Sequence, residues 1–204
     1  KRHGIEDAFV TLQYLASVIQ DSYGDGGAVG MRLRYSVEET PLGTGGSVRQ
    51  IGTALDDTFL VISGDAMTDI DLSAVVAFHK ERKAAVTLTL IRVANPLEYG
   101  VVITQADGRI SKFLEKPSWG EVFSDTINTG IYVIEPRVLE RYAIGEKFDF
   151  SKDLFPQLLA EFSLMVAADN LPNVAGPYVE PSWNLPDVFV GLSDAGSQPP
   201  APLS

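Results

Sequence analysis

The sequence has no cysteine and only two histidines, His3 and His79. Without cysteine the chain has no disulfide framework and no thiolate chemistry. Two histidines exclude a histidine-rich metal centre and argue against histidine-triad catalysis. His79 lies among residues 72–83, whose apolar spacing is that of a helix, and we interpret it as an ordinary helix residue.

Long apolar runs are also missing from the sequence. No run reaches the roughly 18 residues that a membrane span needs, and no apolar signal-peptide core follows the first residues. The formal net charge of −11 argues against a nucleic acid or an anionic membrane as a partner. It leaves nucleotides open, because small phosphates are bound by local amides, a lysine and metal ions. We therefore expect a cytoplasmic protein with small-molecule partners.

Basic residues stop at Lys152, and seven of the twelve prolines follow Ala160. Proline lacks the backbone N–H and fixes φ, so this end of the chain is a poor source of long helices or central strands. We predict a folded body over residues 1–160 and an irregular segment over residues 161–204.

Strand-like and helix-like patterns alternate in the body. Strand patterns cover 8–12, 31–37, 59–62 and 85–93, and helix patterns cover 15–23, 48–55 and 72–83. The run at 59–62 is apolar throughout, which is typical of a central parallel strand covered on both faces.

After Pro96 the pattern changes. Residues 101–114 read as a hairpin around Asp107 and Gly108, residues 126–134 as a strand, and residues 136–142 and 152–161 as helices. We therefore predict an α/β fold with a mixed, mainly parallel, Rossmann-like sheet and helices on both faces. Ligands of such sheets bind beyond the carboxyl ends of the parallel strands.

One carboxylate, Asp65, directly follows the strand pattern at 59–62. There it would project into the ligand crevice with no basic residue close in sequence, so a role as a Mg²⁺ ligand is natural. An ordinary turn aspartate is the alternative. Asp69 and Asp71 form a D-x-D pattern, which holds a metal in some sugar-transferring folds, but Asp71 more simply caps the following helix.

Three glycines and Thr44 fill residues 43–46, between a strand and a helix. They let the backbone approach a flat or anionic ligand closely, although the segment is neither the dinucleotide fingerprint nor a P-loop. A flexible loop before a helix is the alternative interpretation.

Glu115 and Lys116 close the predicted hairpin. A carboxylate accepts two hydrogen bonds from vicinal sugar hydroxyls, and an ammonium pairs with a phosphate. A solvated strand face is the alternative. The tripeptide Asn128–Thr129–Gly130 carries little information by itself.

Five motifs stand in order along the chain. They are Glu-x-x-Pro-Leu-Gly-Thr-Gly-Gly at 38–46, Phe-Leu-Val-Ile-Ser-Gly-Asp at 59–65, Glu-Tyr-Gly-Val-Val at 98–102, Gly-Arg-Ile-x-x-Phe-x-Glu-Lys-Pro at 108–117 and Ile-Asn-Thr-Gly-Ile-Tyr at 127–132. Together they resemble the sugar-1-phosphate nucleotidylyltransferases, and most closely the mannose-1-phosphate guanylyltransferases. The match runs over about residues 5–160.

The resemblance implies that a sugar phosphate oxygen attacks the α-phosphorus of a nucleoside triphosphate, giving a nucleotide sugar and pyrophosphate without a covalent intermediate. It implies that Asp65 binds Mg²⁺ and, with Lys116 on the sugar phosphate, takes part in catalysis. Nucleotide contacts are implied for Glu38, Pro41, Leu42, Gly43, Thr44 and Gly64. Sugar contacts are implied for Gly100, Glu115, Lys116, Asn128 and Thr129.

Glu38 bears on the choice of base. Guanine presents two adjacent donors, N1–H and the N2 amino group, and a carboxylate accepts both. Thymine and uracil present one donor flanked by acceptors, which an amide side chain suits better. Glu38 therefore favours guanine.

The chain departs from the family pattern at both ends. The family's opening strand and its glycine-rich, arginine-bearing loop have no counterpart here, so we expect the sheet to lack its first strand. The family's Trp-x-Asp-x-Gly segment has a loose counterpart at 178–187, where Leu185 stands in place of the second metal ligand. We therefore expect this chain alone to be an incomplete enzyme, which belongs in a longer polypeptide with further domains or in a homo-oligomer.

Other functions stay open. Glucose 1-phosphate with dTTP or UTP is the nearest alternative substrate pair. A non-catalytic module would bind a nucleotide sugar without turnover. A metal-dependent glycosyltransferase would use Asp69 and Asp71.

Overall fold

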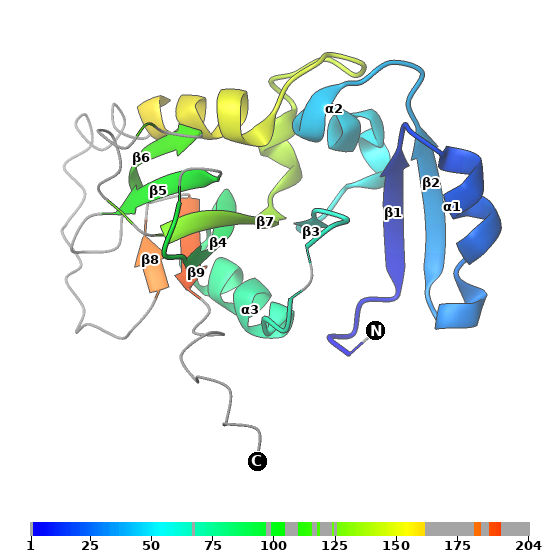
Figure 1. The fold of residues 1–204 in the computed structure, drawn as a ribbon, viewed down its shortest axis with the longest axis horizontal. Helices are drawn as coiled ribbons and strands as arrows, with labels where there is room; N and C mark the ends of the chain where they lie inside the picture. The colour runs from blue at the N-terminus through cyan, green and yellow to red at the C-terminus, as the bar shows by residue number, and fades with distance from the viewer. Residues whose placement is uncertain are drawn as a thin grey trace. The chain divides into compact units, whose positions relative to one another are not determined.

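A computed structural model describes residues 2–66, 68–96, 99–104, 110–115, 118, 124, 126–161, 182–184 and 188–192. The chain forms two compact units (Figure 1). The first unit comprises Lys1–Phe59 and Pro136–Phe155, and the second comprises Leu60–Glu135 and Pro156–Ser204. The domain boundary expected near residue 160 stays a prediction.

The first unit begins with a parallel β–α–β arrangement. Strands β1 (Asp7–Leu12) and β2 (Arg32–Val37) pair in parallel from Asp7 opposite Arg32 to Leu12 opposite Val37. Helix α1 (Ala16–Tyr23) connects them and ends at Gly24, whose φ of 53° is left-handed. A 3₁₀ turn, η1 (Gly27–Val29), leads into β2. These elements confirm the strand and helix patterns predicted for residues 8–37.

Helix α2 (Gly43–Gln50) and the 3₁₀ turn η2 (Gly52–Ala54) follow β2. The loop interpretation of residues 43–46 is therefore wrong, since all three glycines lie in the first turn of α2. The unit is completed by the 3₁₀ turn η4 (Pro136–Leu139), the π-helix η5 (Phe150–Leu154) and the start of a helix at 155–161. The helix predicted at 136–142 is thus only a short 3₁₀ turn.

The second unit is built on a seven-stranded mixed sheet. Its strands are β3 (Phe59–Ile62), β4 (Val86–Arg92), β5 (Gly100–Thr104), β6 (Ile110–Glu115), β7 (Thr126–Ile134), β8 (Ser182–Asn184) and β9 (Val188–Leu192). The order is β6–β5–β7–β4–β9–β8, with β3 pairing β7. β4 runs parallel to β9 and antiparallel to β7. Inner strands β4 and β7 carry the core, because Val86, Leu88, Leu90 and Val133 have no exposed surface.

Helix α3 (Leu72–Arg82) packs on β4 (Figure 1). The predicted cap is confirmed, since Asp71 Oδ1 accepts hydrogen bonds from Ser73 N at 3.0 Å and Ala74 N at 3.1 Å. The hairpin pairing of β5 with β6 is confirmed as well. Its Asp107–Gly108 turn lies outside the described residues.

Three expectations about the sheet are wrong. The seven-stranded sheet is mixed but not mainly parallel, because β4–β9 is parallel whereas β4–β7, β5–β6, β5–β7 and β8–β9 are antiparallel. Strand β3 is not covered on both faces: Phe59, Leu60 and Val61 are half-buried and Ile62 is 41% exposed. The reason is that β3 pairs with β7 alone in the part of the chain that the structure describes. Residues 161–204 do supply an inner strand, because β9 contains no proline and lies between β4 and β8. Among the described residues, no helix is long and apolar enough to cross a membrane.

Candidate active site

The turn that follows β3 is fixed against the middle of β7. Ser63 N–H donates to the carbonyl of Gly130 at 3.0 Å, and Ala66 N–H closes the turn on Ser63 O at 2.9 Å. Gly130 has φ of 75°, and a Cβ there would lie 2.5 Å from Ser63 Oγ. Only glycine fits this close approach in a left-handed conformation. The exposed carboxylate of Asp65 therefore sits on a turn held beside the centre of β7.

Strand β7 is irregular at this point. Its register with β4 shifts between Leu88 and Leu90, as in a β-bulge. Thr129 Oγ1 donates to Thr89 O at 2.9 Å and contacts Thr89 Oγ1. Bulges redirect side chains and are frequent beside active sites.

The amide of Asn128 is oriented within the same bulge. Its Nδ2 donates to the Tyr132 hydroxyl at 2.6 Å, and its Oδ1 accepts from Gly130 N at 3.1 Å. Tyr132 is buried, so this partner holds the amide in one orientation.

Neighbouring strands bring the other predicted sugar residues to the same part of the sheet. Gly100 of β5 pairs with Glu115 of β6, and Val101 pairs with Ile127 of β7. Because β5 and β7 are antiparallel, Gly100 and Asn128 each lie one residue beyond that last pair, on the same side of it. The backbone thus places Glu115, Gly100 and Asn128 in one row across three strands. The side chain of Glu115 and the whole of Lys116 lie outside what the structure describes.

The predicted base-binding residues lie in the first unit. Glu38 follows β2 and is only 8% exposed. Its Oε2 accepts a hydrogen bond from Leu42 N at 3.0 Å, which closes the turn from Glu38 to Leu42. Pro41 and Thr44 are exposed beside it.

The first-turn N–H groups of α2 are bonded within the chain. Phe148 O accepts from Gly45 N at 3.1 Å and Gly46 N at 3.0 Å, and Asp149 Oδ1 accepts from Thr44 N at 3.2 Å. A Cβ on Gly45 would lie 2.2 Å from the Phe148 ring. These glycines thus leave room for a distant segment of the chain, and their predicted role towards a ligand stays a prediction.

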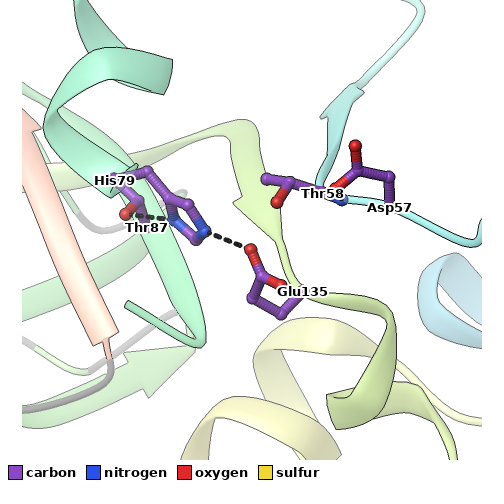
Figure 2. A network of polar contacts seen from close by, with 5 residues as sticks. All are labelled: Asp57, Thr58, His79, Thr87 and Glu135. Atoms are coloured by element: carbon purple, nitrogen blue, oxygen red, sulfur yellow. Dashed lines mark hydrogen bonds and ion pairs between the residues drawn. The ribbon is translucent and has the colours of Figure 1, made fainter. Parts of the chain in front are cut away.

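His79 is a buried polar residue that the sequence predicted only as an ordinary helix residue. His79 is 1% exposed and bridges two elements: its Nδ1 lies 2.8 Å from Thr87 Oγ1 and its Nε2 lies 3.1 Å from Glu135 Oε1 (Figure 2). Burial lowers the pKa of His79, and the hydrogen bond to Glu135 opposes that shift. A neutral ring that donates from Nε2 to Glu135 and accepts at Nδ1 from Thr87 satisfies both contacts. Its position four residues after buried Val75 on α3 is the signal that predicts burial.

The magnesium ligand expected at Asp65 stays a prediction. Among the described residues, no group of three histidines or carboxylates is arranged to hold a metal. Magnesium is usually bound by one or two carboxylates, with water and substrate phosphates completing its six ligands. An exposed carboxylate such as Asp65 fits that pattern once a nucleotide supplies phosphate oxygens.

This chain is similar to a known protein family and to curated relatives. A model of the nucleotidyl transferase family matches residues 1–183. A mannose-1-phosphate guanylyltransferase of Mycobacterium tuberculosis is 38% identical over 159 residues, which make up 78% of this chain and 44% of that protein. A UTP–glucose-1-phosphate uridylyltransferase of Synechocystis is 36% identical over 173 residues, covering 78% of this chain and 45% of that protein.

A solved structure has a similar fold. The crystal structure of HddC from Yersinia pseudotuberculosis superposes with a TM-score of 0.64 at 25% identity, over 76% of this chain and 67% of that one. The predicted α/β fold of the nucleotide-diphospho-sugar transferase type is therefore confirmed. The chain spans about half the length of the curated relatives that it matches, with 44% and 45% of the two named above.

Proposed function

Because the chain belongs to the nucleotidyl transferase family, we propose that it transfers a nucleotidyl group from a nucleoside triphosphate to a sugar 1-phosphate and releases pyrophosphate. GTP and mannose 1-phosphate are the substrate pair that we propose. Similarity to the mannose-1-phosphate guanylyltransferase of M. tuberculosis supports this pair, and so does the choice of a carboxylate at position 38.

The hydrogen bond from Ser63 N to Gly130 O, at 3.0 Å, is the observation that carries the proposal. It holds the Asp65 turn beside the segment of β7 to which we assign the sugar, through Asn128 and Thr129. In-line transfer requires the triphosphate and the sugar phosphate to meet, and positioning supplies much of the rate. A carboxylate held by one backbone contact beside the β7 segment that we assign to the sugar favours this chemistry over separate binding sites.

We assign the reacting phosphates to the second unit. Asp65 would hold Mg²⁺, which when bound offsets the charge that develops on the phosphates. Gly64 is assigned to the nucleotide, and a Cβ there would meet no atom of the described residues within 4 Å. Lys116 is assigned to the phosphate of the sugar, and Glu115 and the backbone at Gly100 to its hydroxyls.

We assign the base to the turn from Glu38 to Thr44 in the first unit. Leu42 N occupies one position on Glu38 Oε2. A carboxylate offers about four acceptor positions, so acceptor capacity remains for the two adjacent donors of guanine. Pro41, Leu42, Gly43 and Thr44 are the other residues of this turn that we assign to the nucleotide.

Glucose 1-phosphate with UTP is a second candidate pair, and one specific observation favours it. The uridylyltransferase of Synechocystis is nearly as similar to this chain as the guanylyltransferase is, at 36% against 38% identity. The two pairs differ in both base and sugar, so they are separable by assay.

Pyrophosphate release tests the function. The 204-residue chain is incubated with Mg²⁺, with GTP, UTP or dTTP, and with mannose 1-phosphate or glucose 1-phosphate. We expect slow release, because this chain alone is expected to be an incomplete enzyme, and we expect that release to be greatest with GTP and mannose 1-phosphate. We expect Glu38→Gln to shift the preference towards UTP or dTTP. An unchanged base preference in Glu38→Gln contradicts the assignment of the base. Calorimetric binding of GDP-mannose without pyrophosphate release from any pair identifies a non-catalytic module instead.

A further inference from the structure

A distant segment clamps the turn to which we assign the nucleotide base. The segment is Phe148–Asp149, and it lies beside the start of α2 although more than a hundred residues separate it from Thr44 in sequence. We propose that Asp149 is a positioning residue that sets the base preference of this chain through the turn from Glu38 to Thr44. The inference rests on the proposed function and goes beyond it, because it places a specificity determinant outside the residues that face the nucleotide.

The first step is the contact of Asp149 with Thr44. Asp149 Oδ1 accepts from Thr44 N at 3.2 Å and from the Thr44 hydroxyl at 3.0 Å, and the same hydroxyl accepts from Phe150 N at 3.1 Å. A carboxylate at a helix N-terminus also interacts favourably with the helix dipole. Asp149 therefore fixes both the backbone and the side chain at the second residue of α2.

The second step runs from Phe148 to Leu42. Phe148 N donates to Leu42 O at 3.0 Å, while Leu42 N donates to Glu38 Oε2. The peptide groups on both sides of Leu42 are thus held, one by the clamp and one by Glu38. A displacement at Phe148–Asp149 is passed to the Glu38 carboxylate through a single residue.

The third step is that the clamp itself is rigid. Phe148 is 3% exposed and stacks on Tyr142 with ring centroids 3.6 Å apart. Phe150 meets Phe148 edge-on at 6.4 Å and stacks on Phe155 at 5.9 Å. This aromatic row anchors the segment in the core, so Asp149 is held in position from its own side of the contact.

Two substitutions of Asp149 test whether its hydrogen bonds with Thr44 matter. Asparagine keeps an oxygen that can accept both hydrogen bonds from Thr44, whereas alanine removes it. Asp25 supplies a matched control in the same unit, since its Oδ1 accepts one backbone hydrogen bond, from Gly27 N at 2.9 Å, which lies outside α2.

The test is calorimetric binding of GTP and UTP, with Mg²⁺, to the 204-residue chain and its variants. We expect Asp149→Ala to bind GTP about tenfold more weakly, as the loss of a charged acceptor implies, and to lose most of its preference for GTP over UTP. Asp149→Asn should restore the preference to near that of the unmodified chain, and Asp25→Ala should leave it unchanged. Amide hydrogen exchange at Thr44, Gly45 and Gly46 should be faster in Asp149→Ala than in the other variants.

Three results overturn the inference. The first is a preference for GTP over UTP that is the same in Asp149→Ala as in the unmodified chain, whatever the change in melting temperature. The second is an Asp149→Asn variant that behaves like Asp149→Ala. If Asp149→Ala does not fold, Asp149→Ser replaces it, and an unchanged preference there has the same meaning. The third overturning result is an unmodified chain that binds neither GTP nor UTP. That result contradicts the proposed function as well, whereas the first two results contradict the inference alone.

Discussion

Replacing Gly45 with alanine tests whether the glycines of α2 exist to admit Phe148. In an exposed helix interior this change stabilises a protein by about 1 kcal/mol, because alanine has the higher helix propensity. Here the new Cβ would lie 2.2 Å from Phe148 Cε2 and 2.5 Å from Cδ2. The ring cannot swing aside freely, because it is buried and stacks on Tyr142. Overpacking of this kind costs about 1–3 kcal/mol, and so close a contact belongs at the upper end of that range.

The net expectation is a destabilisation of about 2 kcal/mol, which is the upper overpacking cost less the gain in helix propensity. For a chain of this size that corresponds to a fall in melting temperature of about 4–8 °C. Urea unfolding followed by circular dichroism measures it for Gly45→Ala, Phe148→Ala and the double variant. In the Phe148→Ala background the clash is gone, so Gly45→Ala should become neutral or stabilising. A stabilising Gly45→Ala in the unmodified chain, or an equal penalty in both backgrounds, would refute the packing argument.

Two further predictions concern the second unit. Burial lowers the pKa of His79, so the fold favours the neutral ring. The stability that the neutral ring contributes is present above about pH 6.5 and is lost as the pH falls towards the lowered pKa. The urea midpoint should therefore fall over that acidic window, and His79→Gln should flatten this dependence; an identical pH profile in the variant would count against it. Asp71→Ala should destabilise the protein by about 1 kcal/mol, because it removes the cap of α3, and Asp71→Asn should cost less. Urea unfolding measures both variants, and equal losses of stability would contradict the role of Asp71 as a cap.

Local sequence signals predicted most of the elements. The periodicity of residues 15–23, the Asp71 cap and the strand patterns of β4 and β7 depend on neighbours within a few positions, so they could be predicted from the sequence alone. The order of the five motifs also led to the family that the comparisons show.

What the sequence could not predict depends on partners far along the chain. The contacts of Gly45 and Gly46 could not be predicted, because nothing nearby in sequence identifies the Phe148 ring above Gly45 or the Glu146 carbonyl beside Gly46. His79 looked ordinary because its partners Thr87 and Glu135 come from a strand and from the residue after another strand. The proline-rich composition of residues 161–204 likewise concealed β9, whose place in the sheet is decided by its pairing with β4.

The central claim is that Asp65, on its turn against β7, is the carboxylate on which nucleotidyl transfer depends. Its most direct test is pyrophosphate release from GTP and mannose 1-phosphate by the unmodified chain, by Asp65→Asn and by Asp69→Asn. Asp69 is an equally exposed aspartate close in sequence, so it controls for the loss of one negative charge. We predict that the slow release expected of this incomplete enzyme is abolished in Asp65→Asn and retained in Asp69→Asn, and that calorimetric binding of GTP with Mg²⁺ weakens in Asp65→Asn alone. Equal release by the unmodified chain and Asp65→Asn, or loss in Asp69→Asn alone, would contradict the claim.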